Sequence, residues 1–439
     1  MNEGTIQASP LKDLFINTLT QDVRVVTCIL DLIDNSVDSY MRHRITGRRA
    51  IDIKLSNESF LIFDTCGGIG KDFLETNVFT FGSTLERGFA TLGMYGIGLK
   101  RSIFKLGNQI SIRTDDGQDY CEMVLNVTDW KNDSSLPWTI PYTYDKSHLN
   151  GDPPYTEIQI SNLTPDVRDK FNSVPFINDV MEILKRTYCL FISDNLDFTL
   201  NGDEVEKYPL IVPDDKEYSP QVHLEQYNDL AIKIICFIDP SKGTRMSKAV
   251  NRVGWNIFCN KRLILPNDTS ATTGWIGANR EDITKLPRYH ALFNEFRGLV
   301  FLDSEDPAKL PLNTSKSDLN TESMVYHYVL DKMVKTARPV IDYIYSKHDQ
   351  EFANEEEIEQ VATQQDTAFN PGLKSVVEIT TPQTFKAPQK IESLPIITRI
   401  QYSKPKDLVD RVKKSIGATS NTEVGARTFD YFVEMEEIK

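Results

Sequence analysis

The chain is organised around one stretch of sequence, Ile29-Leu30-Asp31-Leu32-Ile33-Asp34-Asn35-Ser36-Val37-Asp38-Ser39. Its apolar residues recur at spacings of three and four, which predicts an amphipathic helix within a longer helix over residues 22–46. Asp31, Asn35 and Asp38 share that spacing on an adjoining face, where side chains one turn apart are neighbours. A carboxylate and an amide placed in this way can hold a water molecule and a hydrated cation. The other interpretation is the ordinary solvated face of an amphipathic helix.

Composition limits the class of protein. A chain of 439 residues, 40% of them hydrophobic, is long enough for two or three domains with full cores. The net charge of −14 argues against general coating of nucleic acid, although a local basic surface stays compatible with it. Six cysteines without CxxC pairs favour reduced thiols over disulfides or a zinc site. No signal peptide and no apolar run near twenty residues is found, so we expect a soluble, cytoplasmic protein without membrane contact.

A second motif, Asp64-Thr65-Cys66-Gly67-Gly68-Ile69-Gly70, follows two strands predicted at residues 51–55 and 60–63. Glycine adopts backbone angles that other residues avoid and lets a ligand approach the main chain. A carboxylate fixed at the end of a strand can accept a hydrogen bond from an exocyclic amine. The other interpretation is a glycine turn that only reverses the chain.

A third motif, Gly93-Met94-Tyr95-Gly96-Ile97-Gly98-Leu99-Lys100, runs into a helical pattern. Backbone N–H groups at the start of a helix form an anion site, and a lysine adds a point charge that suits phosphate. The spacing fits neither a Walker A loop nor a Rossmann fingerprint. Residues 79–90, between the two glycine motifs, are expected to form a mobile loop that closes over a nucleotide as a lid.

Strands are predicted at residues 109–113, 119–127 and 155–161, and the last carries Thr156 near its start. Taken in order, Asp31/Asn35, Asp64-x-x-x-Gly68, Gly93-x-Tyr-Gly-x-Gly-x-Lys100 and Thr156-x-Ile-x-Ile resemble the motifs of the GHKL ATPases. That superfamily includes gyrase B, the heat-shock chaperones, histidine kinases and MutL. The wording of residues 95–100 is most similar to the MORC branch and to related bacterial ATP-binding proteins. The resemblance covers roughly residues 25–165.

The resemblance implies an α/β (α+β) fold of the Bergerat type, a mixed sheet with helices on one face, that binds ATP with Mg²⁺. It implies that Asn35 coordinates the Mg²⁺, that Asp64 accepts from the adenine amine, and that Thr156 supports this contact. The remaining nucleotide contacts are then expected from Gly68, Ile69, Gly93, Tyr95, Gly96, Ile97, Gly98, Leu99 and Lys100.

Two residues depart from the family pattern. The hydrolysing branches commonly carry glutamate at the catalytic position, where this chain has Asp31. Aspartate can act as the base, but its arm is one methylene shorter, and a misplacement of about 1 Å can cost about a hundredfold in rate. We therefore expect slow hydrolysis. Asp34 is a weaker substitute because its helix angle turns it away from Asn35. Tyr155 replaces a glycine that relatives often have beside the base pocket.

The pattern changes beyond residue 200. It predicts a hairpin at residues 200–205, an apolar strand at 231–238, a strand–turn–strand over 254–265, and helices at about 285–297 and 322–346. This order resembles the transducer domain that follows the ATPase domain in MutL, gyrase B and MORC proteins. In those relatives a transducer lysine reaches the γ-phosphate.

The matching loop here contains Lys316, which we expect to do the same as a second catalytic residue. The other interpretation of Lys316 is a solvated loop lysine, and Asn279-Arg280 is a fainter candidate for stabilising the site. The γ-phosphate would then bridge both domains and favour a closed arrangement. Relatives couple this closure to dimerisation, so the expected partners are ATP, a second copy of the chain, and a DNA or protein client.

The expected organisation is an ATP-binding domain over residues 1–205, a transducer-like domain over 206–347, an acidic and proline-containing linker over 348–395 and a small helical module over 396–439. The module should consist of two short helices joined by a turn. Its basic half could contact nucleic acid, but a dimerisation or docking role fits the acidic tail better.

Three functions of different classes stay open. The first is a dimerising ATPase switch of the MORC or MutL type. The second is a nucleotide-sensing interaction module with little or no hydrolysis. The third, a histidine kinase, is disfavoured because only about twenty residues precede the first motif helix, too few for a helix that carries a phosphorylated histidine.

Overall fold

The computed structural model describes residues 12–80, 96–132, 138–192, 195–239, 253–277, 284–313, 316, 318–357, 372–387 and 403–436. The chain divides into two compact units. One comprises Met1–His348 with Thr367–Gln389, and the other comprises Asp349–Asp366 with Lys390–Lys439. Within the described ranges, no helix is both long and apolar enough to cross a membrane.

The first unit begins with an N-terminal subdomain, residues 12–204, built on one large sheet. Its strands are β1 (Arg49–Leu55), β2 (Ser59–Asp64), β3 (Gly107–Asp115), β4 (Asp119–Asn126), β5 (Tyr142–Lys146), β6 (Tyr155–Leu163), β7 (Leu196–Leu200) and β8 (Asp203–Glu204). They are ordered β5-β4-β3-β6-β2-β1-β7-β8. The pairing of β1 with β7 is parallel and the others are antiparallel. The strands predicted in this region are therefore present.

Helices cover one face of this sheet. They are α1 (Lys12–Thr20), α2 (Val25–Arg42), α3 (Lys71–Phe73), α4 (Gly98–Leu106), α5 (Val127–Asn132), α6 (Pro165–Phe171), α7 (Val174–Thr187) and α8 (Cys189–Ile192), with a π-helical turn over Leu74–Val78. Residues alternate along each strand, so Ile110 and Ile112 enter the core while Arg113 pairs with Glu122 and Glu157 on the other face. The result is the two-layered mixed α/β architecture that was predicted.

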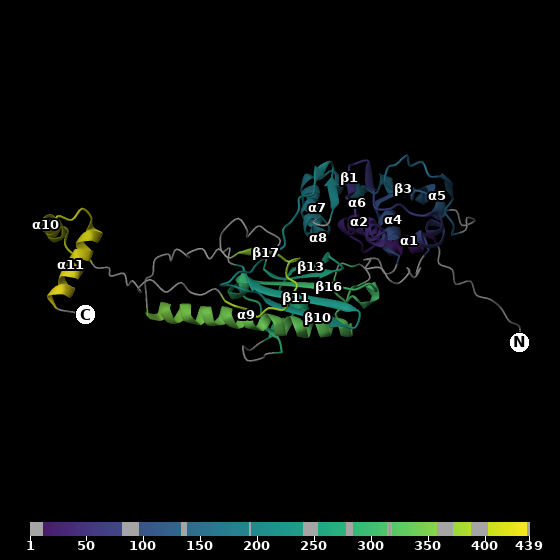
Figure 1. Ribbon diagram of the computed structural model, residues 1–439. Helices are drawn as coiled ribbons and strands as arrows, with labels where there is room; N and C mark the ends of the chain where they lie inside the picture. Colours follow the sequence, from purple (N-terminus) through teal and green to yellow (C-terminus); the bar gives the residue numbers. More distant parts are fainter. Residues whose placement is uncertain are drawn as a thin grey trace, which may run out of the picture. The chain divides into compact units, whose positions relative to one another are not determined.

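Helix α2 lies at the centre of this layer, next to α4 (Figure 1). Ile29, Ile33 and Val37 are completely buried against the sheet, as the periodicity of the sequence predicts. The polar residues of α2 therefore point away from the core. The polar side chains of α2 are therefore available for contacts with other parts of the chain.

The second subdomain is built on a five-stranded sheet of order β10-β11-β16-β12-β13. The elements of this part of the chain are β9 (Ile211–Pro213), β10 (Gln221–Tyr227), β11 (Leu230–Ile238), β12 (Gly254–Cys259), β13 (Arg262–Asp268), β14 (Trp275–Gly277), β15 (Leu286–Pro287), β16 (Phe296–Asp303), α9 (Met324–Glu357) and β17 (Leu373–Ser375), with 3₁₀ turns at Ala271–Thr273, Ala291–Glu295 and Pro307–Lys309. Two short ladders pair β14 with β15 and β9 with β17. Helix α9 lies along one face of the five-stranded sheet (Figure 1).

Both faces of the five-stranded sheet are covered. Neighbouring residues of β11 point to opposite faces, and each face packs into its own hydrophobic core. Ile234 packs with α9, while Ile235 packs on the opposite face. There it meets a C-terminal strap, residues 372–387, whose Val376 and Ile379 are buried. Lys233 Nζ donates hydrogen bonds to the carbonyls of both strap residues, at 2.6 and 3.0 Å.

Two expectations for this region differ from the structure. The helix predicted over 285–297 is wrong. It is replaced by β15, a 3₁₀ turn and the start of β16, because the pairing of β16 between β11 and β12 outweighs local helical periodicity. The first residues of the linker predicted over 348–395 belong to α9, and its described segment 372–387 pairs with β9 and packs on the five-stranded sheet.

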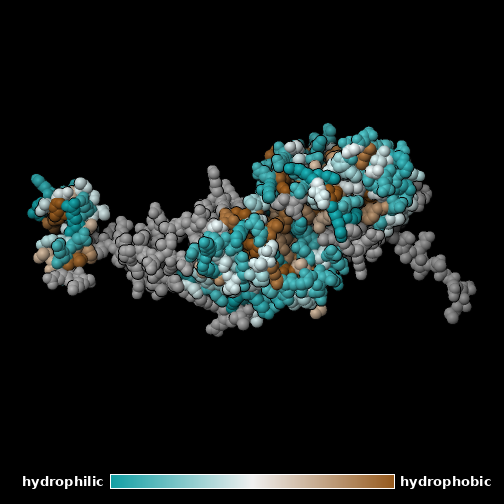
Figure 2. All heavy atoms as spheres, viewed as in Figure 1, coloured by the Kyte–Doolittle hydropathy of each residue, from teal (hydrophilic) through white to brown (hydrophobic). Residues whose placement is uncertain are grey.

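The second unit contains the two predicted short helices, α10 (Lys406–Ile416) and α11 (Asn421–Met435). Gly417 ends α10 with a φ of 65°, and Ser420 caps α11 by accepting from the N–H of Glu423. Hydrophobic side chains remain on its surface (Figure 2), including Phe429, Tyr431, Phe432 and Met435. In these two helices only Val424 is buried.

One glycine of the five-stranded sheet gives a stability prediction. Gly298 lies opposite Trp255, and a Cβ added to it would be 2.2 Å from Cε3 of the indole. We expect Gly298→Ala to lower the free energy of unfolding of this subdomain by about 1–3 kcal/mol through overpacking. Urea unfolding followed by tryptophan fluorescence measures this change. Gly425→Ala is the matched control because a Cβ there meets nothing within 4 Å, and equal effects of the two substitutions would contradict the prediction.

Candidate nucleotide site

A cavity of about 630 Å³ lies between α2, the start of α4 and the strands β2, β3 and β6. This volume is in the usual range for small-molecule sites. Twelve of the predicted site residues line it: Asp31, Asn35, Asp64, Gly68, Ile69, Gly96, Ile97, Gly98, Leu99, Lys100, Thr156 and Lys316. Gly93, Tyr95, Asn279 and Arg280 lie outside the described residues, as does most of the expected lid. The fold thus gathers these residues, and their individual roles stay predictions.

Asp31 sits on α2 and is held by two residues of α4. Its Oδ2 accepts hydrogen bonds from Arg101 Nε at 2.8 Å and from Ser102 Oγ at 3.1 Å. Its Oδ1 has no hydrogen-bond partner among the residues that the structure describes. Gly98 lies beside this oxygen, and a Cβ added to it would be in ordinary van der Waals contact with Oδ1, at 3.5 Å. The carboxylate is fixed through one oxygen and can accept through the other.

Asn35 has the only α2 amide on the cavity wall. Its Nδ2 is buried and has no partner among the described residues, which is unusual for a buried polar group and fits a site that a ligand completes. The described part of the chain contains no cluster of three or more acidic, histidine or cysteine ligands that could hold a metal. Mg²⁺ needs no such cluster, because it usually takes one or two protein oxygens together with waters and phosphates. The Asn35 carboxamide oxygen fits that role.

The start of α4 can receive an anion. Ile97 precedes the helix and provides no side-chain cap, so the first N–H groups have no capping side chain. Lys100 Nζ donates to the carbonyls of Thr80, at 2.7 Å, and of Gly96, which stand on either side of residues 81–95. Burial lowers the pKa of Lys100 to about 8. To contact a phosphate as predicted, the ammonium group of Lys100 must give up its hydrogen bond to at least one of these carbonyls and form one to a phosphate oxygen instead.

Asp64 stands at the end of β2, at the other end of the cavity. Its Oδ2 accepts from Ser36 Oγ at 2.6 Å and its Oδ1 from the N–H of Cys66 at 2.8 Å. Thr156 lies opposite Asp64 in the β2–β6 ladder, and its hydroxyl is 3.2 Å from that of Thr114. Burial raises the pKa of Asp64 to about 6, although both hydrogen bonds lower it. A further hydrogen-bond donor would therefore stabilise the charged form of this carboxylate.

The glycine turn after Asp64 docks on β3. Gly68 has a φ of 69°, and a Cβ there would lie 2.4 Å from the carbonyl oxygen of Asp115. Glycine is thus required by the close packing of two main chains. Ile69 N–H donates to Thr114 Oγ1 at 2.7 Å, which fixes the turn. Tyr155 does not line the cavity, because it stacks on Phe63 with ring centroids 5.5 Å apart.

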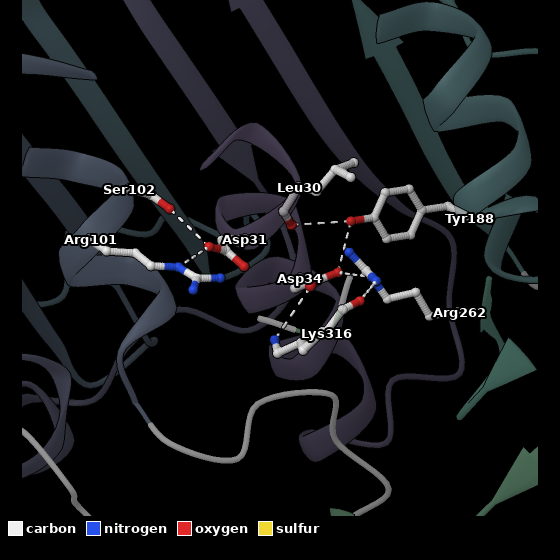
Figure 3. A network of polar contacts seen from close by, with 8 residues as sticks. All are labelled: Leu30, Asp31, Asp34, Arg101, Ser102, Tyr188, Arg262 and Lys316. Carbon is white, nitrogen blue, oxygen red and sulfur yellow. Dashed lines mark hydrogen bonds and ion pairs between the residues drawn. The ribbon is translucent and has the colours of Figure 1, made fainter. Parts of the chain in front are cut away.

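A buried ionic cluster, which the sequence did not predict, lies behind the cavity wall (Figure 3). Asp34 of α2 is completely buried, and its Oδ1 accepts from Tyr188 Oη and from Arg262 Nε, both at 2.8 Å. Its Oδ2 is 3.3 Å from Lys316 Nζ. Burial alone raises the pKa of Asp34, but the charges of Arg262 and Lys316 and the Tyr188 hydrogen bond outweigh it and hold the pKa below its usual range.

This cluster connects the two subdomains. Asp34 and Tyr188 belong to the N-terminal subdomain, whereas Arg262 starts β13 and Lys316 follows the five-stranded sheet in the chain. No sequence signal could have identified Arg262, because it is separated from Asp34 by 228 positions and follows an ordinary hairpin turn.

Comparison with known families agrees with this geometry. Residues 23–156 match the family described as histidine kinase-, DNA gyrase B-, and HSP90-like ATPase. The match runs from just before α2 to Thr156, and so contains most of the cavity wall. This part of the chain belongs to the GHKL ATPase superfamily, whose domains bind ATP, typically with Mg²⁺. The predicted family and fold class are confirmed. No curated protein matches the chain.

The raised pKa of Asp64 predicts a pH dependence of ATP affinity. If Asp64 accepts a hydrogen bond from the adenine amine, as the resemblance implies, the charged carboxylate present above about pH 6 would make that bond, and protonation below about pH 6 would weaken it. We expect the affinity to fall by up to about tenfold for each pH unit below 6. Calorimetric titration of Mg-ATP between pH 8 and pH 5 measures it. Asp64→Asn is the control, because the titration of the ligand is common to both proteins, and identical pH profiles would contradict the prediction.

Proposed function

We propose that the chain is a Mg²⁺-dependent ATPase that acts as an ATP-gated, dimerising conformational switch on DNA or on a protein partner, in the manner of MORC and MutL proteins. The observation that most supports this is the position of Lys316. It belongs to the second subdomain, yet it lines the cavity of the N-terminal subdomain. A ligand in this cavity would therefore contact both parts of the first unit.

In this proposal the cavity holds ATP in one orientation. The adenine amine donates to Asp64, and the phosphates lie at the N-terminus of α4, where backbone N–H groups and the helix dipole favour negative charge. Asn35 holds the Mg²⁺, which neutralises phosphate charge when bound. Lys316 faces the terminal phosphate. This direction of binding is supported by the two ends of the cavity, because Asp64 is a hydrogen-bond acceptor at one end and the N-terminus of α4 and Lys316 are donors at the other.

Asp31 is the group that would activate the attacking water. Its Oδ2 is held by Arg101 and Ser102, and this leaves Oδ1 to accept the proton of the water. The two α4 residues fix the direction of the carboxylate, which general base catalysis requires. Lys316 would stabilise the charge that develops on the terminal phosphate. The short arm of aspartate makes slow turnover the expectation.

ATP would act on conformation through its differential affinity for the closed arrangement, in which Lys316 reaches the phosphate. Hydrolysis removes that phosphate and with it the contact. Dimerisation would follow closure, because both subdomains would then present one fixed surface to a second copy of the chain.

A second candidate function has an observation in its favour. One oxygen of Asp31 is already committed to an arginine and a serine, and its arm is short, so the site could bind ATP without hydrolysing it. The chain would then be a nucleotide-sensing interaction module. The two candidates differ in chemistry and share the same binding site.

Replacement of Asp31 separates these candidates. Under the ATPase proposal, Asp31→Asn lowers kcat by about a hundredfold or more and leaves the Kd for Mg-ATP nearly unchanged, because the amide can still accept from Arg101. Asp31→Glu restores the longer arm and keeps turnover measurable. Steady-state phosphate release and calorimetry provide both numbers. If the wild type and Asp31→Asn are equally inert while ATP still binds, the sensing module is the correct function.

The switch is tested by the molar mass in solution. Light scattering should give a monomer without nucleotide and with ADP, and a dimer with Mg²⁺ and a non-hydrolysable ATP analogue. Lys316→Ala should bind the analogue more weakly and remain monomeric. An unchanged mass at saturating analogue would contradict the dimerising switch.

A further inference from the structure

The buried cluster around Asp34 carries an excess of positive charge (Figure 3). One carboxylate faces two cations, Arg262 and Lys316, whose side chains are 5% and 12% exposed. The neighbouring acid, Asp31, is already paired with Arg101. These five side chains sum to one positive charge, which an anion would balance. The cavity beside Lys316 is where that anion can enter.

The two cations hold Asp34 with different strength. Arg262 Nε lies 2.8 Å from Oδ1, while Lys316 Nζ lies 3.3 Å from Oδ2. Tyr188 donates to Oδ1 as well, so Asp34 keeps two close donors when the lysine leaves. Lys316 is therefore the partner that can be exchanged, and Arg262 is the partner that stays.

Arg262 also fixes the main chain of Lys316. Its Nη1 donates to the carbonyl oxygen of Lys316 at 2.8 Å. Lys316 has a φ of 53°, a left-handed conformation that a non-glycine residue adopts only where its surroundings enforce it. One planar guanidinium thus links the α2 carboxylate to the residue whose ammonium group borders the cavity. Lysine at position 262 could not make both contacts in this fork geometry.

We propose that Arg262 is a positioning residue that holds Lys316 at the cavity edge, and that Asp34 is the resting partner from which the terminal phosphate of a nucleoside triphosphate withdraws the lysine. This inference rests on the proposed function, since it takes the cavity to be the ATP site. A diphosphate lacks the group that competes with Asp34. The cluster accordingly sets the preference of the site for ATP over ADP.

The proposal gives opposite effects for two substitutions in the same cluster. Arg262→Lys releases the main chain of Lys316, so the affinity for ATP relative to ADP should fall on the order of tenfold, as for a lost charge-assisted hydrogen bond. Asp34→Asn removes the competing charge, so the same ratio should rise by a comparable factor. A purely structural cluster would instead lower both affinities together in both variants.

The experiment is a calorimetric titration of the full chain with a non-hydrolysable ATP analogue and with ADP, both with Mg²⁺. Each variant is also made in the Lys316→Ala background, where its effect on the ratio should vanish if it acts through the lysine. Arg297→Lys is the matched control, because Arg297 forms a similar buried pair with Asp239 and does not line the cavity. ADP binding shows that each variant is folded at the site.

The outcomes separate this inference from the proposed function. If the wild type prefers the analogue and the ratio falls in Arg262→Lys and rises in Asp34→Asn, the inference holds. If the wild type binds both nucleotides but the ratio is equal in all variants, or changes as much in Arg297→Lys, the positioning role is refuted and the ATP site stands. If the wild type binds neither nucleotide, the proposed function itself fails.

Discussion

The rest of the structure depends on the burial of one carboxylate, that of Asp34. A charged group without solvent requires compensation from the protein, and here Tyr188 and Arg262 donate to Oδ1 while Lys316 lies beside Oδ2. Removing one partner of such a buried pair typically costs about 3–5 kcal/mol. Helix α2 is therefore held to the second subdomain by the buried ion pairs of Asp34, and separating Asp34 from both cations would leave its charge buried without a partner.

Helix α2 has three faces with three different tasks. The apolar face packs into the sheet, Asp31 and Asn35 form a wall of the cavity, and Asp34 joins the second subdomain. These residues are separated by at most four positions, so they move as one rigid turn of helix. A displacement of Asp31 or Asn35 at the cavity wall therefore also displaces Asp34, which contacts the second subdomain. The slow hydrolysis and the conformational coupling that we propose would be compatible with each other, because the coupling needs only binding.

Much of this could be predicted from the sequence where the signal is local. The periodicity of α2, the two glycine motifs and the strands that precede the first of them are short patterns whose geometry follows from the chain itself. The ionic partners Arg101 and Arg262 could not be predicted, because they meet α2 only after the fold has formed. The same reason explains the helix wrongly predicted at 285–297, where β16 is stabilised by partners distant in sequence. The strap at 372–387 gave no signal, since its few buried side chains follow no period.

The identity of the site is tested most directly by comparing ATP with GTP in a calorimetric titration of the full chain with Mg²⁺. We expect one bound ATP per chain and an affinity for GTP at least about tenfold lower. The guanine carbonyl would place a lone pair against the Asp64 carboxylate, where adenine has a donor. Equal affinities for the two nucleotides would contradict the proposed base pocket at Asp64. Absence of binding by both would contradict the nucleotide site altogether.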